Sequence, residues 1–139
     1  MPALCLDTNT YSAHRAGNPE AVRIIGAADQ VWLPAPVLGE LRAGFLKGNK
    51  TAENELGLQA FLAADCVHVA TVDEACSRLF AQVFDQLRKA GTPIPMNDVW
   101  IAACALKAGC ALYTLDAHFK SVDGLLLVQS SQDWADYAS

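Results

Sequence analysis

The chain has 139 residues, of which 53% are hydrophobic and 18% charged, so it has the length and apolar content of one domain with its own core. Its formal net charge of −5 and sequence pI of about 5.0 argue against a nucleic-acid binder that works through a generally basic surface. The mean hydropathy of +0.19 favours an apolar surface that is covered by a partner or a second copy.

The location and redox state follow from simple features of the chain. The longest strongly apolar stretch, residues 99–106, is too short to cross a bilayer. Asp7 stands where a signal peptide needs a basic region followed by an apolar one, so we expect a cytoplasmic protein. The five cysteines are scattered and include no CxxC pair, which predicts reduced, mostly buried thiols rather than a disulfide or zinc framework.

Strand-like and helix-like segments alternate along the chain, with no repeat or linker that would divide it. Such alternation implies one α/β domain, residues 1–139, with a parallel sheet and helices on both faces. Pro19, Gly91 and Gly109 stand at expected helix boundaries. The expected elements are strand 3–6, helix 8–15, helix 19–26, strand 30–33, a helix opened by Pro36, a helix capped by Thr51 through about 64, strand 66–70, helix 72–90, a helix capped by Asn97 through 108, strand 111–115, a helical turn at 119–122 and strand 125–128.

Four carboxylates stand where this pattern brings them to one edge of the sheet. Asp7 and Asp116 end the first strand and the run 111–115, so both project from the carboxyl ends of strands, where open α/β sheets bind ligands. Glu40 and Asp98 lie in the expected first turns of two helices. Crossover helices run antiparallel to the strands, so their amino ends return to that same edge. The four acids can therefore meet.

Each acid also has a structural explanation. Asp7 could cap the next helix, Asp116 could begin a turn, and Asp98 would gain from the helix dipole. Glu40 could be a solvated glutamate, although no basic residue stands three or four positions further on. Together the four are harder to explain structurally, because clustered carboxylates repel unless they are protonated or neutralised by a metal.

Other common chemistries find no support in the sequence. His14, His68 and His118 form no spaced pair such as HExxH, which makes zinc hydrolysis a poor explanation. GxSxG, GxGxxG and GxxxxGK[ST] are all absent. Carboxylates without histidine or thiolate select Mg²⁺ or Mn²⁺, ions that activate water against phosphodiesters.

Four segments, in this order and over nearly the whole chain, resemble the PIN-domain ribonucleases, and most closely the VapC-type toxins of toxin–antitoxin pairs. They are LDTN at 6–9, LGELRAG at 38–44, NDVWIAA at 97–103 and TLDAHF at 114–119. The resemblance implies a five-stranded parallel sheet, a homodimer and an antitoxin bound at the site. The sequence departs from this pattern at His118, where many members have another acid or an amide. The resemblance therefore does not decide whether a second metal site is occupied. The residues that it implies are the metal-binding catalytic acids Asp7, Glu40, Asp98 and Asp116, and the supporting polar residues Asn9 and Thr114.

The expected mechanism combines this chemistry with the resemblance. The three aspartates would hold one Mg²⁺ or Mn²⁺, with Glu40 holding a second ion or reaching the first through water. In-line attack by an activated water would leave a 5′-phosphate and a 3′-hydroxyl, and the resemblance alone implies RNA as the substrate. Arg42, Lys47 and Lys50 could position the RNA backbone, although a solvated helix face explains them as well.

We expect the antitoxin to insert an arginine among the acids, because a guanidinium pairs bidentately with carboxylates. Its segment would cover the surface between the Glu40 helix and the next one, over Phe45, Leu46 and Leu58.

Two other function classes stay open. One is a non-catalytic binding module of the same fold. The other is a phospho-signalling domain of the receiver or haloacid-phosphatase kind, although Asn9 stands where the phosphatase pattern needs an aspartate.

Overall fold

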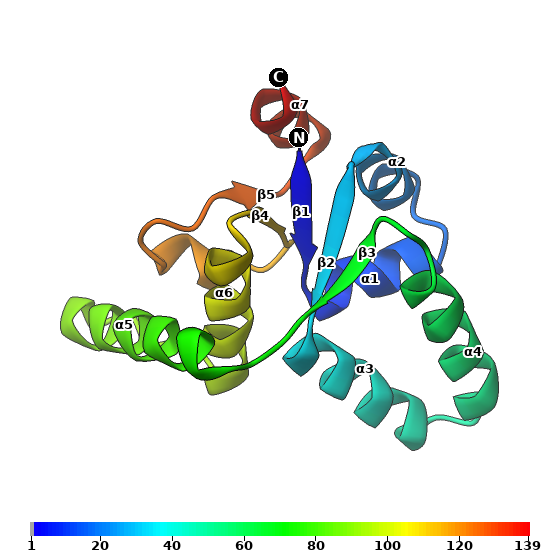
Figure 1. Ribbon diagram of the computed structural model, residues 1–139, viewed down its shortest axis with the longest axis horizontal. Helices are drawn as coiled ribbons and strands as arrows, with labels where there is room; N and C mark the ends of the chain where they lie inside the picture. Colours follow the sequence, from blue (N-terminus) through cyan, green and yellow to red (C-terminus); the bar gives the residue numbers. More distant parts are fainter. Residues whose placement is uncertain (1) are drawn as a thin grey trace.

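A five-stranded parallel sheet in the order β3-β2-β1-β4-β5 forms the centre of the computed structural model, which describes residues 2–139 (Figure 1). This confirms the predicted α/β class and parallel sheet. The strands are β1 (Ala3–Leu6), β2 (Gln30–Pro34), β3 (Val67–Ala70), β4 (Ala111–Tyr113) and β5 (Leu127–Val128). The helices are α1 (Thr8–Arg15), α2 (Pro19–Ala27), α3 (Ala35–Lys47), α4 (Thr51–Leu62), α5 (Glu74–Ala90), α6 (Met96–Ala108), the 3₁₀ helix η1 (Ala117–Ser121) and α7 (Ser131–Ala138).

Strand β1 is buried on both faces. Leu4, Cys5 and Leu6 have no exposed surface, as expected for a central strand of a parallel sheet with helices on both sides. The chain leaves β1 toward β2 and β3 and later returns to place β4 on the other side of β1. The strand order therefore reverses between β1 and β4. In open α/β sheets, the crevice beyond the carboxyl ends at such a reversal is where ligands bind.

Two helical layers enclose the sheet (Figure 1). Helix α6 packs on β2, β3 and β4, with α5 outside it, while α1, α2 and α4 lie on the opposite face. Nearly every residue of α6 from Val99 to Ala105 is buried, which explains why that stretch is apolar all round. The helix ends at Gly109, whose positive φ of 68° is the left-handed conformation that glycine adopts without steric cost.

Two of the expected helix caps are wrong. Helix α6 begins before Asn97, and its N-cap is Pro95, which has extended backbone and no side-chain cap bond. Proline fixes its own φ and so can start a helix without a polar side chain. Thr51 is the first residue of α4 and Lys50 is the N-cap. The Thr51 hydroxyl instead donates to the carbonyl oxygen of Phe45 at 2.7 Å, which ties α4 to the end of α3.

Most other boundaries lie within two residues of those expected, but the chain has one further helix. The expected strands 111–115 and 125–128 shorten to β4 and β5, and the expected helix 72–90 begins at Glu74 after its N-cap Asp73. Helix α7 follows β5 where no element was expected. Ser130 is its N-cap, and Trp134 and Tyr137, three residues apart, pack against the core. Tyr137 fixes it to the sheet: its hydroxyl donates to the carbonyl of Ala3 at 2.8 Å and accepts from the N–H of Ala111 at 3.3 Å.

All five cysteines are free, and all except Cys66 are buried, as the scattered pattern predicted. Within residues 2–139, no helix combines the length and apolar character needed to cross a membrane.

Candidate active site

One cleft of about 150 Å³ opens beyond the carboxyl ends of β1 and β4. It receives side chains from the β1–α1 junction, α3, α6 and the segment after β4. All four predicted acids therefore line the same cleft, at the point where the strand order reverses. The lining residues are Asp7, Thr8, Asn9, Glu40, Asp98, Ile101, Asp116 and Phe119.

Asp7 is held by three hydrogen bonds. It is the N-cap of α1, and its Oδ1 accepts from the backbone N–H of Thr10 at 2.9 Å and lies 3.0 Å from the Thr10 hydroxyl. Its Oδ2 accepts from the hydroxyl of Thr114. The residue is only 5% exposed. Asp7 therefore caps the helix and also lines the cleft, so its structural and functional explanations are compatible.

The environment of Asp7 disfavours its negative charge. Burial raises the pKa of this carboxyl, hydrogen bonds from Thr114 and Thr10 lower it, and the nearby charge of Asp116 raises it again, with a net upward shift. A cation in the cleft would reverse this effect, because an opposite charge favours the ionised form.

Glu40 lies in the second turn of its helix rather than in the first, where it was expected; the observed start at Ala35 is one residue before the expected start at Pro36. Helix α3 begins at Ala35, which places Glu40 in the second turn, because an α-helix has about 3.6 residues per turn. Its side chain still reaches the cleft, where Oε1 accepts a hydrogen bond of 2.9 Å from the hydroxyl of Thr8. Thr8 thus positions an acid that stands 32 residues away in the chain.

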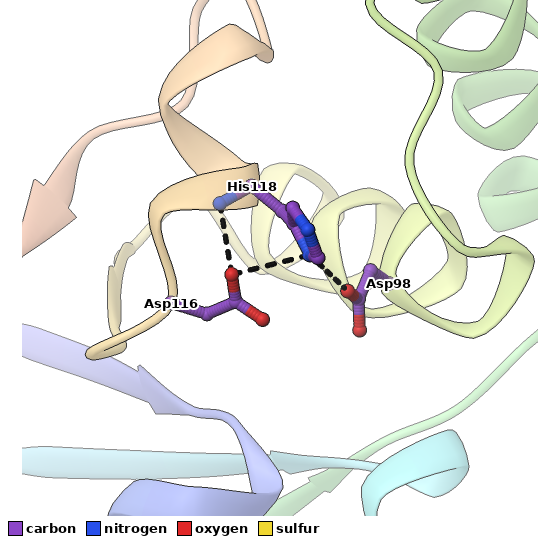
Figure 2. Close-up of side chains that lie close together, drawn as sticks. All are labelled: Asp98, Asp116 and His118. Atoms are coloured by element: carbon purple, nitrogen blue, oxygen red, sulfur yellow. Dashed lines mark hydrogen bonds and ion pairs between the residues drawn. The ribbon is translucent and has the colours of Figure 1, made fainter.

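His118 lies between two of the acids (Figure 2). Its Nδ1 is 3.2 Å from Oδ1 of Asp116 and 3.5 Å from Oδ2 of Asp98. Asp98 occupies the first turn of α6, as predicted, and Asp116 caps η1 by accepting from the N–H of His118 at 2.9 Å. The candidate ligand atoms of these three residues all lie within 4.8 Å of one another.

Asp98 also carries a pKa shift. Burial raises the pKa of its carboxyl, the charges of Asp116 and Glu40 raise it further, and His118 lowers it, with a net upward shift. Within residues 2–139, the ion pairs made by lysine and arginine include none of the four acids. The cleft is therefore a negatively charged site without a lysine or arginine to neutralise it, and its oxygen donors fit a divalent cation.

Thr114 joins the acids that follow the two neighbouring strands. Its hydroxyl donates to Asp7 and its oxygen accepts the backbone N–H of Asp116 at 3.0 Å. Asn9, the other predicted supporting residue, lines the cleft and is exposed. Thr10, which is fully buried and bonds to Asp7, was not predicted from the sequence. Its position three residues after a helix N-cap was the available signal.

The three basic residues predicted to hold substrate differ in their surroundings. Arg42 forms a two-bond pair with Glu55 of α4, with Nε to Oε1 at 3.0 Å and a terminal nitrogen to Oε2 at 2.9 Å. Its guanidinium is thus engaged by α4. Lys47 and Lys50 lie at the α3–α4 connection and are exposed.

The chain is similar to known proteins both in sequence and in fold. A model of the PIN domain family matches residues 4–125. The chain is 28% identical over 124 residues to Ribonuclease VapC5 of Mycobacterium tuberculosis, which covers 89% of this chain and 90% of the relative.

Solved structures show the same fold. VapBC2 of Rickettsia felis, bound to a DNA fragment from its promoter, superposes with a TM-score of 0.83 and 22% identity, over 93% of this chain and 99% of that one. VapBC-5, a toxin–antitoxin system of Mycobacterium tuberculosis, gives a TM-score of 0.73 and 26% identity, over 93% and 99%.

Proposed function

This chain belongs to the PIN domain family, and on that premise we propose that it is a divalent-metal-dependent endoribonuclease, the toxin of a toxin–antitoxin pair. The observation that carries the proposal is the cleft, in which four carboxylates without a lysine or arginine partner meet where the strand order reverses. Its likeness to a ribonuclease named VapC5, along nearly the whole of both chains, supports the same activity.

We assign the three aspartates Asp7, Asp98 and Asp116 as ligands of a Mg²⁺ or Mn²⁺ ion, and Glu40 as the ligand of a second ion or a water-mediated contact. When bound, such an ion activates water and stabilises charge on the phosphate and leaving oxygens. In-line attack would leave a 5′-phosphate and a 3′-hydroxyl.

The protein's own contribution to the reaction is positioning. Thr114 and Thr10 hold the two oxygens of Asp7, and Thr8 holds Glu40. The bonds to Asp7 are buried and the bond to Glu40 is exposed. Hydrogen bonds of this kind keep the carboxylates in place before the substrate arrives, which lowers the cost of organising the site. Ile101 and Phe119, both almost fully buried, form the apolar part of the cleft lining.

RNA cleavage tests the proposal directly. Purified protein should cut RNA with Mg²⁺ or Mn²⁺ and stop with chelator, and Asp7→Asn, Asp98→Asn and Asp116→Asn should each lose most activity, because an amide keeps the shape but is a poorer cation ligand. Asp65→Asn is the matched control, since Asp65 is exposed just before β3, at the opposite edge of the sheet.

The same assay separates the alternatives. A non-catalytic binding module would leave RNA intact with every metal. If Asp98→Asn cleaves at the wild-type rate under limiting metal, our assignment of the site is wrong. The phospho-signalling alternative loses its support, because the PIN family model covers residues 4–125.

For the partner, we propose a small antitoxin that inserts an arginine among the acids. Its segment would cross the surface between α3 and α4. Leu46 is 75% exposed and Leu56 is 67% exposed there, so both offer apolar contact. The contact expected from Leu58 is wrong, because that side chain is fully buried. Phe45 is partly buried beside Tyr11.

Expression in bacterial cells tests this part of the proposal. The chain alone should arrest growth, and coexpression of the antitoxin should relieve the arrest. If cells that express the wild-type chain grow as well as cells that express Asp98→Asn at the same protein level, the toxin role is contradicted. The RNA-cleavage assay would still decide whether the protein is a nuclease. We further propose a homodimer in the cytoplasm; light scattering after gel filtration and cell fractionation test these two points.

A further inference from the structure

His118 is the one imidazole among the residues that line or adjoin the cleft in the described chain. Its side chain is 55% exposed, so no packing requirement fixes the ring where it lies. The ring nevertheless turns toward Asp98 and Asp116, and its Nδ1 lies within 3.5 Å of an oxygen from each (Figure 2). The other two histidines lie elsewhere: His14 packs against Phe61, and His68 lies beside Trp32 of the neighbouring strand.

The spacing of these atoms suits the ligands of one ion. Adjacent ligands of an octahedral ion with bonds of about 2.1 Å are separated by roughly 3.0 Å. The two nitrogen-to-oxygen distances, 3.2 Å and 3.5 Å, are close to that edge length. Asp98 and Asp116 are partly buried and His118 is exposed, so a small shift of the imidazole is the movement that would bring the three atoms to bonding distance of one ion.

We infer that His118 is a direct ligand of the divalent ion, together with Asp98 and Asp116, and that this ligand makes the site prefer Mn²⁺ to Mg²⁺. The inference rests on the proposed function for the presence of an ion in the cleft. Mg²⁺ strongly prefers oxygen ligands, whereas imidazole nitrogen binds the first-row transition metals well. An imidazole added to the carboxylate ligands assigned above therefore favours the transition metal.

A protonated imidazole paired with two carboxylates would show similar distances, so the test has to separate a ligand from a counter-ion. Pulsed electron paramagnetic resonance on the RNA-free protein with Mn²⁺ does so, because a bound imidazole nitrogen couples to the electron spin of the metal. We expect a ¹⁴N coupling in wild type, its loss in His118→Gln, and its retention in His68→Gln, the matched control on β3. Absence of the coupling in Mn²⁺-loaded wild type would overturn the inference.

Calorimetric titration measures the preference itself. His118→Gln should weaken Mn²⁺ binding by about 10-fold or more, as expected when a metal site loses part of its ligand environment, and Mg²⁺ binding by much less. His118→Asp should bind Mg²⁺ more tightly relative to Mn²⁺ than wild type does. An unchanged ratio of the two affinities in both variants contradicts the preference. Melting curves in chelator establish that each variant is folded.

These readouts are independent of RNA cleavage. A protein that shows the ¹⁴N coupling but cuts no RNA would refute the proposed nuclease and leave the ligand assignment intact. A protein that cuts RNA with Mn²⁺ but shows no coupling would refute the ligand assignment alone.

Discussion

The hydroxyl of Thr114 donates a hydrogen bond to Oδ2 of Asp7, a residue 107 positions earlier in the chain, and its oxygen accepts the backbone N–H of Asp116. Thr114 is fully buried and Asp7 is almost so. One hydroxyl thus fixes the relative positions of the two acids that follow β1 and β4. Because neither water nor another side chain can easily replace a fully buried hydroxyl, this small group should affect both stability and activity.

Thr114→Val should show this effect, since valine has nearly the same shape and lacks the hydroxyl. Asp7 would lose a donor and the N–H of Asp116 its acceptor, and a buried unsatisfied group costs about 1–3 kcal/mol. We expect a lower free energy of unfolding in urea and a loss of RNA cleavage. Thr114→Ser keeps the hydroxyl and should stay close to wild type. A valine variant with wild-type stability and activity would contradict this role.

Stability without metal should depend on pH through Asp98. The folded state raises the pKa of this carboxyl above its ordinary value of 3.8, so the folded protein holds the proton more tightly than the unfolded chain does. That contribution is fully present below the ordinary pKa and is lost as the pH rises through the raised pKa. In chelator, the melting temperature of Asp98→Asn should therefore rise relative to that of wild type as the pH increases from the ordinary pKa of 3.8 through the raised one. A difference that stays constant over this range, or falls, would contradict the shift.

Divalent metal should stabilise the folded protein. An ion that binds only the folded state adds about 2.7 kcal/mol at a concentration one hundred times its dissociation constant, and it also relieves the repulsion among the acids. The melting temperature should rise with Mn²⁺ concentration in wild type and in Asp65→Asn, and the rise should be much smaller in Asp98→Asn. A wild-type melting curve that does not move across millimolar Mg²⁺ and Mn²⁺ would argue against a metal site in the cleft.

The sequence predicted those parts of the cleft that depend on strand ends. Asp7 and Asp116 follow β1 and β4, and the carboxyl ends of parallel strands share an edge, so their meeting needed only the strand assignments. Glu40 was harder to place. The start of α3 was expected within one residue of where it lies, yet Glu40 was assigned to the first turn and lies in the second. Its reach into the cleft depends on the direction of its side chain toward Thr8, which local pattern does not give.

Contacts between distant segments could not be predicted from local pattern. The link from Thr8 to Glu40, and that from His118 to Asp98, depend on side-chain directions that are set by packing around the whole sheet. Helix α7 was missed although Ser130 caps it and Trp134 and Tyr137 stand at helical spacing. It has only eight residues, and its attachment through Tyr137 appears only when the strands are in place. The ion pair between Arg42 and Glu55 could likewise be predicted only from the angle between α3 and α4.

The ion pair between Arg42 and Glu55 bears on which cations contact RNA. Glu55 engages the guanidinium of Arg42, whereas Lys47 and Lys50 are exposed at the α3–α4 connection and make none of the ion pairs found within residues 2–139. Phosphate contacts by cations release counterions, so each lost contact should reduce the salt dependence of single-stranded RNA binding by about 0.7 in log–log slope. Lys47→Ala and Lys50→Ala, each made in cleavage-deficient Asp98→Asn protein, should weaken binding and flatten this slope.

Arg42→Ala should change RNA affinity by less than about twofold in the same background, because its charge is already paired. Arg78→Ala is the matched control, since Arg78 pairs with Glu74 on the exposed surface of α5. Fluorescence anisotropy with a labelled RNA at several salt concentrations measures both affinity and slope. If Arg42→Ala weakens binding as strongly as the lysine variants while Arg78→Ala does not, then Arg42 must release Glu55 to contact RNA, and the pairing seen in the free protein is a resting state that substrate displaces.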